Sequence, residues 1–235
     1  MKTISRDLRD LSSCRRCPRL VTHLDCQRQR FPNYFNAPVP PRGRKSARLL
    51  IMGLAPGASG ANRTGRVFVG DSSSDFLAAA LLRTGFGEMP ADASLDPLDS
   101  GALQLKGVRL SNVVKCLPPA NSPTAAEVTA CAGYLATEVA DLWRPGVRTP
   151  RVLLALGGTA FRALFAALPA ELVRPRPLPK FGHGVELALA PRLTLLASFH
   201  PSRLNTQTGR LTPPMFDQVL TRARDLLGTA QGTSA

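Results

Sequence analysis

Four short apolar runs alternate with helical patterns along this chain. Turn residues bound each run, and the runs cover residues 47–53, 108–114, 151–157 and 193–199. Short runs without polar positions are typical of strands that are buried on both faces of a parallel sheet. Helical length and periodicity mark residues 75–83, 125–143, 159–168 and 215–227. The alternation predicts an α/β fold, a three-layer α/β/α sandwich around a central, mostly parallel, four-stranded sheet.

The size of the chain favours one domain. Its 235 residues, 44% of them hydrophobic, supply enough apolar surface for a single well-filled core. We therefore expect one domain over residues 1–235, with residues 1–46 packed on it as an amino-terminal arm. Residues 229–235 resemble a frayed tail.

The charge of the chain is strongly positive. Lysine and arginine number 30 against 16 acidic residues, a net charge of +14. A basic protein can simply be well solvated, but an excess of this size favours nucleic acid as the partner. No amphipathic helix gathers the basic residues, and the apolar runs are too short to span a bilayer. We expect no membrane contact and a cytoplasmic location, since the charged start lacks the apolar stretch of a signal peptide.

Two segments differ from the rest in charge. Residues 27–48 mix arginines with aromatic residues and form a candidate arm for contacting a nucleic-acid backbone, although a solvated loop fits them equally well. Residues 86–106 carry Glu88, Asp92, Asp96 and Asp99 among Pro and Gly. We expect an acidic loop there, away from nucleic acid.

Chemically distinctive residues follow every predicted strand. Gly53 to Gly57 follow the first, Lys115-Cys116 the second, Gly157-Gly158 the third and His200-Pro201-Ser202 the last. Ligands of open α/β sheets bind at the carboxyl ends of the strands. The sequence therefore places the site along one rim of the sheet.

Four of the five cysteines have the spacing of a metal site. Cys14 and Cys17 form a C-x-x-C pair, and Cys116 and Cys131 add two thiols. Four thiolates suit either zinc or an iron–sulfur cluster. The wide second pair mildly favours the cluster, and spacing alone leaves both open. We expect Cys26 to be a plain thiol.

The first rim segment is suited to a flat ligand. Glycine at Gly53 and Gly57 would let backbone amides approach such a ligand closely. Phe68 could stack on it. Asp71 could supply a carboxylate, but a helix cap before three serines explains this residue as well.

Taken in order, the motifs resemble the uracil-DNA glycosylase superfamily, and within it family 5, whose members carry a four-iron, four-sulfur cluster. The resemblance covers nearly the whole chain. It is carried by Cys14-x-x-Cys17-Pro18-Arg19-Leu20, Gly53-Leu54-Ala55-Pro56-Gly57-Ala58, Asn62-Arg63-Thr64-Gly65-Arg66, Gly70-Asp71, Cys116 with Pro118-Pro119-x-Asn121, Cys131, and His200-x-Ser202-Arg203-x-Asn205 with its continuation to Thr212.

The resemblance implies a DNA repair enzyme that flips deaminated bases out of duplex DNA and hydrolyses their glycosidic bonds. Uracil would be the main substrate, with hypoxanthine, xanthine or ethenocytosine as further ones and single-stranded DNA as a second context. A four-iron, four-sulfur cluster on Cys14, Cys17, Cys116 and Cys131 would be the cofactor, held partly by the arm. We expect a monomer that works at the nucleoid.

The resemblance also implies a role for each rim residue. Asp71 and His200 would be catalytic, and Asn121 would help to hold the attacking water. The base would be bound by Gly53, Ala55, Gly57, Ala58, Phe68 and Asn112. The DNA backbone and the gap left by the flipped base would be met by Ser59, Ser202, Arg203, Leu204 and Arg210.

The chain departs from family 5 at three positions. Ser59 replaces a histidine, Pro201 replaces a valine, and Asn112 replaces a small residue. Pro201 and Asn112 are similar to family 4, whereas Leu54 stands where family 4 has a glutamate. Asn112 could bond the uracil edge and so narrow the range of bases.

Strand cleavage would need an amine for a Schiff base. The chain has only five lysines, and Lys115 alone falls in a rim motif. We therefore expect a monofunctional hydrolase. The alternative is a non-catalytic iron–sulfur protein that binds nucleic acid, which the charge and the cysteines would equally allow.

Overall fold

The computed structural model describes residues 7–90, 102–168, 172, 175 and 177–228, and their central element is a five-stranded sheet in the order β4-β1-β5-β7-β6. The bounds are Leu49–Gly53 for β1, Val108–Asn112 for β4, Arg151–Leu156 for β5, Glu186–Ala190 for β6 and Leu193–Ser198 for β7. Strands β4, β1, β5 and β7 are parallel, as predicted, whereas β6 runs antiparallel to β7. The predicted α/β class is confirmed.

The fifth strand corrects the predicted count of four. Strand β6 lies at the edge of the sheet, and only Leu189 of its five residues is fully buried. An edge strand with one solvated face lacks the continuous apolar run that marked the other four strands. It joins β7 through a turn in which Arg192 has a φ of 69°.

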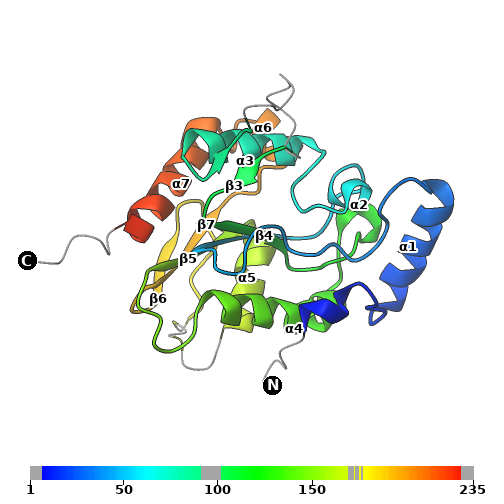
Figure 1. The fold of residues 1–235 in the computed structure, drawn as a ribbon, viewed down its shortest axis with the longest axis horizontal. Helices are drawn as coiled ribbons and strands as arrows, with labels where there is room; N and C mark the ends of the chain where they lie inside the picture. Colours follow the sequence, from blue (N-terminus) through cyan, green and yellow to red (C-terminus); the bar gives the residue numbers. More distant parts are fainter. Residues whose placement is uncertain (1–6, 91–101, 169–171, 173–174, 176, 229–235) are drawn as a thin grey trace, which may run out of the picture.

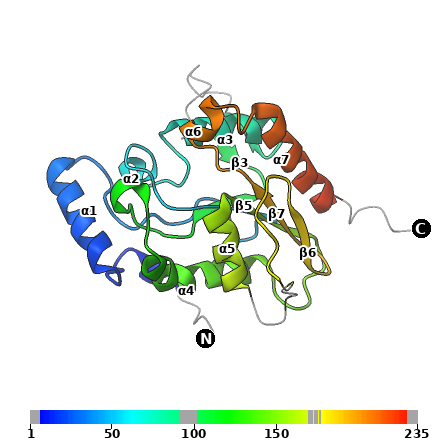
Figure 2. The same ribbon diagram turned by 180° about the vertical axis from the view of Figure 1, so that it is seen from behind.

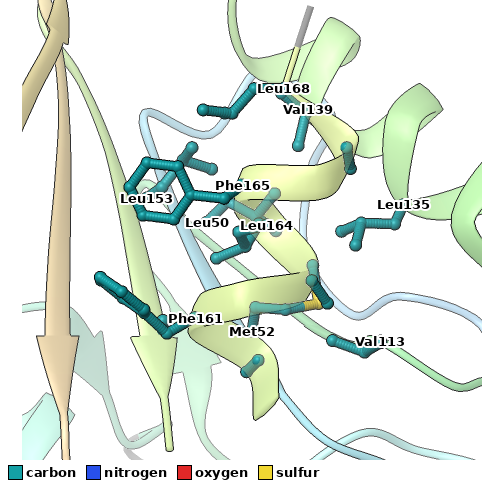
Figure 3. Packing of buried hydrophobic residues seen from close by; sticks show 14 of the residues in the cluster. Leu50, Met52, Val113, Leu135, Val139, Leu153, Phe161, Leu164, Phe165 and Leu168 are labelled. Atoms are coloured by element: carbon teal, nitrogen blue, oxygen red, sulfur yellow. The ribbon is translucent and has the colours of Figure 1, made fainter. Parts of the chain in front are cut away.

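Helices cover both faces of the sheet, which makes three layers (Figures 1 and 2). The long helices are α3 (Ser72–Arg83), α4 (Ala125–Leu142), α5 (Gly158–Ala167) and α7 (Pro213–Gly228). Alternate residues of each strand point to opposite faces. Leu50 and Met52 of β1 accordingly pack with α4 and α5, as Figure 3 shows, while Leu49 and Ile51 pack with α3 and α7.

The amino-terminal arm contains two helices, both before residue 31. Helix α1 (Pro18–Arg30) follows the short 3-10 helix η1 (Leu8–Leu11) and begins with a proline, which needs no hydrogen-bond acceptor for a backbone N–H there. Leu20 and Leu24 enter the same core as α4. Arg19 donates two 2.8 Å hydrogen bonds to Glu127, at the start of α4. These contacts join the arm to the α4 side of the sheet.

Three shorter helices border the carboxyl rim. They are α2 (Ala61–Thr64), η2 (Pro119–Asn121) and α6 (Arg203–Gln207). Helix α4 starts with the capping box of Thr124 and Glu127. Each short helix follows a strand end and carries residues of the rim motifs.

The segment predicted as an acidic loop contains a small antiparallel ladder of β2 (Gly87–Glu88) and β3 (Gln104–Leu105). Glu88 forms an ion pair with Lys106 across it, at 2.5 Å. Asp92, Asp96 and Asp99 lie outside the described residues, as does the predicted tail of residues 229–235. None of the helices in the described part of the chain is long and apolar enough to cross a membrane.

Candidate active site

The carboxyl ends of the parallel strands open into a single pocket of about 440 Å³. Its size falls in the usual range for small-molecule sites. Segments after β1, β4 and β7 and the start of α3 form its walls. The lining residues are Leu54, Ala55, Gly57, Ala58, Ser59, Ala61, Phe68, Asp71, Ser72, Ser73, Ser74, Asn112, Asn121, His200, Ser202 and Arg203. The structure thus brings together most of the residues predicted for catalysis and base binding.

Gly53 has no side chain and does not line the pocket itself. It pairs with Asn112 in the sheet register. A Cβ atom at Gly53 would be 2.5 Å from Oδ1 of Asn112 and 2.9 Å from Cζ of Phe68. Glycine at this position therefore lets the amide and the aromatic ring occupy the space above the strand end. Asn112 is 4% exposed, so little of its side chain is open to bulk solvent.

One pocket residue, Phe68, has a strained backbone. Its φ is 53°, in the left-handed region that bulky residues avoid, whereas asparagine tolerates the φ of 54° found at Asn121. Such strain persists only where the surrounding structure imposes it, and it concentrates at functional sites. The ring of Phe68 lies 6.3 Å from that of His200, centroid to centroid, with 31° between the planes. Phe68 is therefore held facing the pocket, where it can stack on a flat ligand.

Asp71 is both a helix cap and a pocket residue. Its Oδ1 accepts hydrogen bonds from the backbone N of Ser74 (2.9 Å) and from Oγ of Ser74 (2.7 Å), which caps helix α3. The cap interpretation is therefore correct. Because Oδ1 makes both cap bonds, the orientation of the carboxylate is fixed and Oδ2 is left for the pocket.

Oδ2 of Asp71 lies in a recess formed by two glycines. A Cβ atom built at Gly60 would be 2.0 Å from this oxygen, and one at Gly57 would be 3.0 Å from it. A side chain at Gly60 and the present position of the carboxylate therefore exclude each other. Gly60 is a site residue that the sequence analysis missed.

We expect Gly60→Ala to reduce kcat/KM for the reaction of this pocket at least tenfold, roughly the effect of misplacing a reacting group by 1 Å or less. The new methyl group must push the Asp71 carboxylate aside. The measurement is kcat/KM beside the melting temperature, with Gly228→Ala as the control, since a Cβ at Gly228 meets nothing within 4 Å. Wild-type kinetics in Gly60→Ala would show that the position of Oδ2 is unimportant.

His200 follows β7 and is held from two sides. Its carbonyl accepts a 2.8 Å hydrogen bond from Nδ2 of Asn205. Gly157, after β5, would place a Cβ only 3.6 Å from the Cβ of His200. Burial lowers the pKa of His200 below its ordinary value of 6.5, and the Asp71 carboxylate opposes this shift only partly. The imidazole is therefore neutral at pH 7 and can donate one N–H.

The lowered pKa of His200 determines how stability and kcat/KM depend on pH. A depressed pKa means that folded His200 binds its proton only below pH 6.5, at a lower pH than in the unfolded chain. The stability contributed by neutral His200 is complete above pH 6.5 and is lost as the pH falls through the folded pKa. We expect kcat/KM to stay level at pH 7 and to fall along an acid limb centred below 6.5. A limb centred above 6.5 in the pH–rate profile would contradict the neutral assignment.

The residues predicted to contact DNA surround the mouth of the pocket. Ser59, Ser202 and Arg203 line it, and Leu204 stands beside it at the start of α6 with 72% of its surface exposed. Arg210 does not line the pocket, and its guanidinium lies 4.5 Å from the ring centroid of Phe199. Arg210 is thus the one member of this set that lies away from the pocket mouth, and its contact with DNA stays a prediction.

The basic arm of residues 27–48 is mostly engaged by the protein itself. Arg28 pairs with Asp25, and Arg30 lies over the ring of Phe31. Arg42 donates to the carbonyl of Leu103, and Arg48 to that of Leu227. Four of the five arginines in this segment thus make contacts within the protein, and its contact with a nucleic-acid backbone stays a prediction.

Four cysteines line one small cavity between α1, α4 and the segment after β4: Cys14, Cys17, Cys116 and Cys131. Burial raises the pKa of Cys17 to about 11, and the neighbouring Cys131, Glu127 and Cys14 raise it as well. Burial is also the main cause of the raised pKa values of Cys116 and Cys131. Cys26 is exposed and lies apart. Among the residues described by the structure, no group of three or more His, Cys, Asp or Glu side chains could hold a metal ion.

Arg63 was also missed as a site residue. Its Nε donates to the carbonyl of Ser59 (2.7 Å) and its Nη2 to that of Gly70 (3.1 Å), which closes the loop from the pocket wall to Asp71. The planar, multi-donor guanidinium suits this double contact. The sequence did show an arginine inside the motif of residues 62–66, but its positive charge by itself did not indicate a role for it.

Comparison with known proteins agrees with the fold and the pocket. The family described as the uracil DNA glycosylase superfamily matches residues 40–224, so the chain belongs to that superfamily. Its relatives include type-5 uracil-DNA glycosylases from Mycobacterium bovis, 43% identical over 93% of this chain and 80% of the relative, and from Thermus thermophilus, 42% identical over 93% and 95%. Within the superfamily the chain is a member of the type-5 branch, as its motifs predicted.

Similarity to the type-4 branch is weaker. A type-4 uracil-DNA glycosylase from Pyrobaculum aerophilum is 33% identical over 60% of this chain and 59% of its own length. The resemblance to family 4 that was predicted at Asn112 and Pro201 is therefore minor beside the type-5 relationship of the whole chain.

Proposed function

We propose that this chain is a monofunctional glycosylase that excises uracil from DNA by hydrolysis and leaves an abasic site. The observation that carries the proposal is the pairing of two groups in one pocket: the anchored carboxylate of Asp71 and the neutral imidazole of His200. Membership of the type-5 branch supports uracil as the substrate.

The two groups match the charges that form as a glycosidic bond breaks. The C1′–N1 bond electrons leave with uracil, so negative charge grows on its O2 and positive charge on the sugar. Neutral His200 can donate a hydrogen bond to O2, and Asp71 can stabilise the cationic sugar. The carboxylate also orients a water whose oxygen bonds to C1′, while the proton of that water passes to the departing base or to solvent. Asn121, which lines the pocket, would help to hold this water.

The base would be bound by contacts on its face and its edge. Phe68 would stack on the ring, while backbone groups of Ala55, Gly57 and Ala58 and the amide of Asn112 would bond the polar edge. Hypoxanthine, xanthine and ethenocytosine are proposed as further substrates, which the uracil-directed amide of Asn112 would disfavour. A competition assay with these bases in otherwise identical duplexes tests this order.

Duplex DNA would be engaged through base flipping. Flipping costs a few kcal/mol and is cheapest at a mispair such as uracil opposite guanine. Leu204, 72% exposed beside the pocket mouth, can fill the gap in the stack, as apolar wedges do. Ser59, Ser202 and Arg203 at the mouth would hold the flanking phosphates. We propose that the protein acts on DNA as a monomer in the cytoplasm, at the nucleoid.

The lysines support a hydrolase without strand-cleaving activity. None of the four described lysines, at positions 45, 106, 115 and 180, lines the pocket. Lys115 is 1% exposed, and its Nζ forms an ion pair with Glu138. Its amine is therefore not available to form a Schiff base with the sugar.

We further propose that Cys14, Cys17, Cys116 and Cys131 hold a four-iron, four-sulfur cluster. Their thiols line one cavity, and buried thiols with raised pKa values need bound positive charge to become thiolates. A cluster spreads four thiolates over more space than a single ion does, which suits a cavity without a compact ion site. When bound, it supplies iron–thiolate bonds that link the arm to α4 and to the segment after β4. Brown protein with iron and acid-labile sulfide supports this proposal, and colourless protein with zinc alone overturns it.

One assay tests the proposed function. Oligonucleotides with a single uracil, either opposite guanine or in a single strand, are incubated with the protein and split with alkali to reveal abasic sites. We expect cleavage of the duplex after alkali and none without it. An intact duplex would instead support the alternative, a non-catalytic iron–sulfur protein that binds nucleic acid.

A further inference from the structure

Lys115 is a buried charge that the proposed chemistry does not use. It lies between the pocket and the cysteines, directly before Cys116. Its Nζ donates to Oε2 of Glu138 (2.6 Å), to Oγ of Ser111 (2.6 Å) and to the carbonyl oxygen of Asn112 (2.7 Å). A lysine ammonium has three N–H donors. All three are used, so the side chain has one defined position.

The Lys115–Glu138 ion pair is a poor source of stability. The side chains are 1% and 0% exposed, and Oε1 of Glu138 has no hydrogen-bond partner. Removing two charges from water costs several kcal/mol per ion, and replacing such a pair by apolar residues of similar volume is often neutral or stabilising. An apolar pair could fill the same volume, although it would leave the hydroxyl of Ser111 and the carbonyl of Asn112 without the ammonium as a donor. The ion pair is therefore better explained by the defined position that it gives to Lys115 than by a contribution to the stability of the fold.

The position that the pair fixes is the end of β4. The carbonyl that Lys115 binds belongs to Asn112, whose side chain lines the base pocket above Gly53. From the other side, the carbonyls of Gly53 and Leu54 hold the backbone of the next two residues, with bonds of 3.0 and 2.9 Å. The Asn112 peptide thus lies between β1 and the ammonium, and the orientation of its amide depends on both.

Helix α4 holds Lys115 at two points. Glu138 binds its ammonium, and Cys131 accepts a hydrogen bond from its backbone N–H. Cys131 and Glu138 are seven residues apart, about two helical turns, and therefore lie on one face of the helix. One helix face thus anchors both ends of the residue that supports the pocket.

We propose that the Lys115–Glu138 pair is a positioning element that sets the amide of Asn112 against the flipped base. The pair acts through Asn112 and touches no reacting atom. This inference rests on the proposed uracil excision, because it assigns the pair a part in recognition at that same pocket.

The test is a double-mutant cycle in the full chain on the duplex with uracil opposite guanine. Lys115→Met with Glu138→Leu replaces the pair by apolar residues. We expect a folded protein whose melting temperature falls by a few degrees, because two buried acceptors lose their donor. We expect a loss of kcat/KM of roughly 10²-fold, the order that small misplacements at a site can cost. In an Asn112→Ala background the same replacement should cost less than about twofold, because the amide to be positioned is gone.

Ser111→Ala provides a second cycle that removes only one acceptor of the ammonium and keeps the core volume. We expect a smaller loss, roughly three- to tenfold, which again vanishes in the Asn112→Ala background. Wild-type kinetics in the apolar double variant overturn the proposal, as do losses that add in full to that of Asn112→Ala. If the apolar variant does not fold, the Ser111→Ala cycle alone decides in the same way. Failure of the wild-type chain to excise uracil would instead overturn the proposed function.

Discussion

Asp71→Asn is expected to fold like the wild type and to lose roughly 10³-fold in kcat for uracil excision, the scale found when one preorganised charge-stabilising group is removed. Asparagine is as good a helix cap as aspartate, so Oδ1 of the new amide can still accept the bond from Ser74. What is lost is the negative charge at Oδ2 beside Gly57 and Gly60. The measurement is a single-turnover rate on the duplex with uracil opposite guanine.

Two further variants separate the effect of the negative charge of Asp71 from the effect of its helix cap. Asp71→Ser keeps a capping oxygen and removes the carboxylate, so it should be as slow as Asp71→Asn. Ser74→Ala removes one donor to the carboxylate and keeps the charge, so it should retain most of the rate. Asp71→Asn with wild-type kinetics would reduce Asp71 to a helix cap.

His200→Leu is expected to lower kcat roughly 10²- to 10³-fold, because no donor remains for the charge on uracil O2. His200→Gln should recover part of this loss, since its amide is also a neutral donor. Because the lowered pKa keeps His200 neutral, the reaction requires a neutral hydrogen-bond donor, and the neutral amide of glutamine should partly replace the imidazole.

The acid limb of the pH–rate profile provides a second readout for His200. It should disappear in His200→Gln, whose side chain does not titrate. His23→Gln is the matched control, since His23 lies on α1 and does not line the pocket. Equal rates for His200→Leu and His23→Gln would remove His200 from the mechanism.

Much of the fold and of the site was predictable from local sequence. The four parallel strands lie within short, mainly apolar runs, His200 follows the end of a strand, and Asp71 stands directly before a helix. Because parallel strands bring their carboxyl ends to one rim, position along the chain already implied position in space. Helix α4 was likewise marked by its capping box.

What the sequence did not reveal depends on contacts between distant segments. The recess for Asp71 needs Gly60, and only the three-dimensional approach of the two shows why that residue is glycine. Lys115 and Glu138 are 23 residues apart, and no sequence motif links the two. Strand β6 has one solvated face, so its pattern resembles that of a surface segment. In each case tertiary contacts, and not local preference, decide the outcome.

The most direct test of the central claim is a single-turnover measurement of uracil release from a duplex with one uracil opposite guanine. It compares the wild type with Asp71→Asn and His200→Leu, after their melting temperatures have shown that all three proteins are equally stable. We predict that the wild type releases free uracil and leaves an abasic site, while each variant binds the same duplex and releases uracil at least roughly 10²-fold more slowly. An intact substrate with the wild type, or equal rates for all three proteins, would contradict the account.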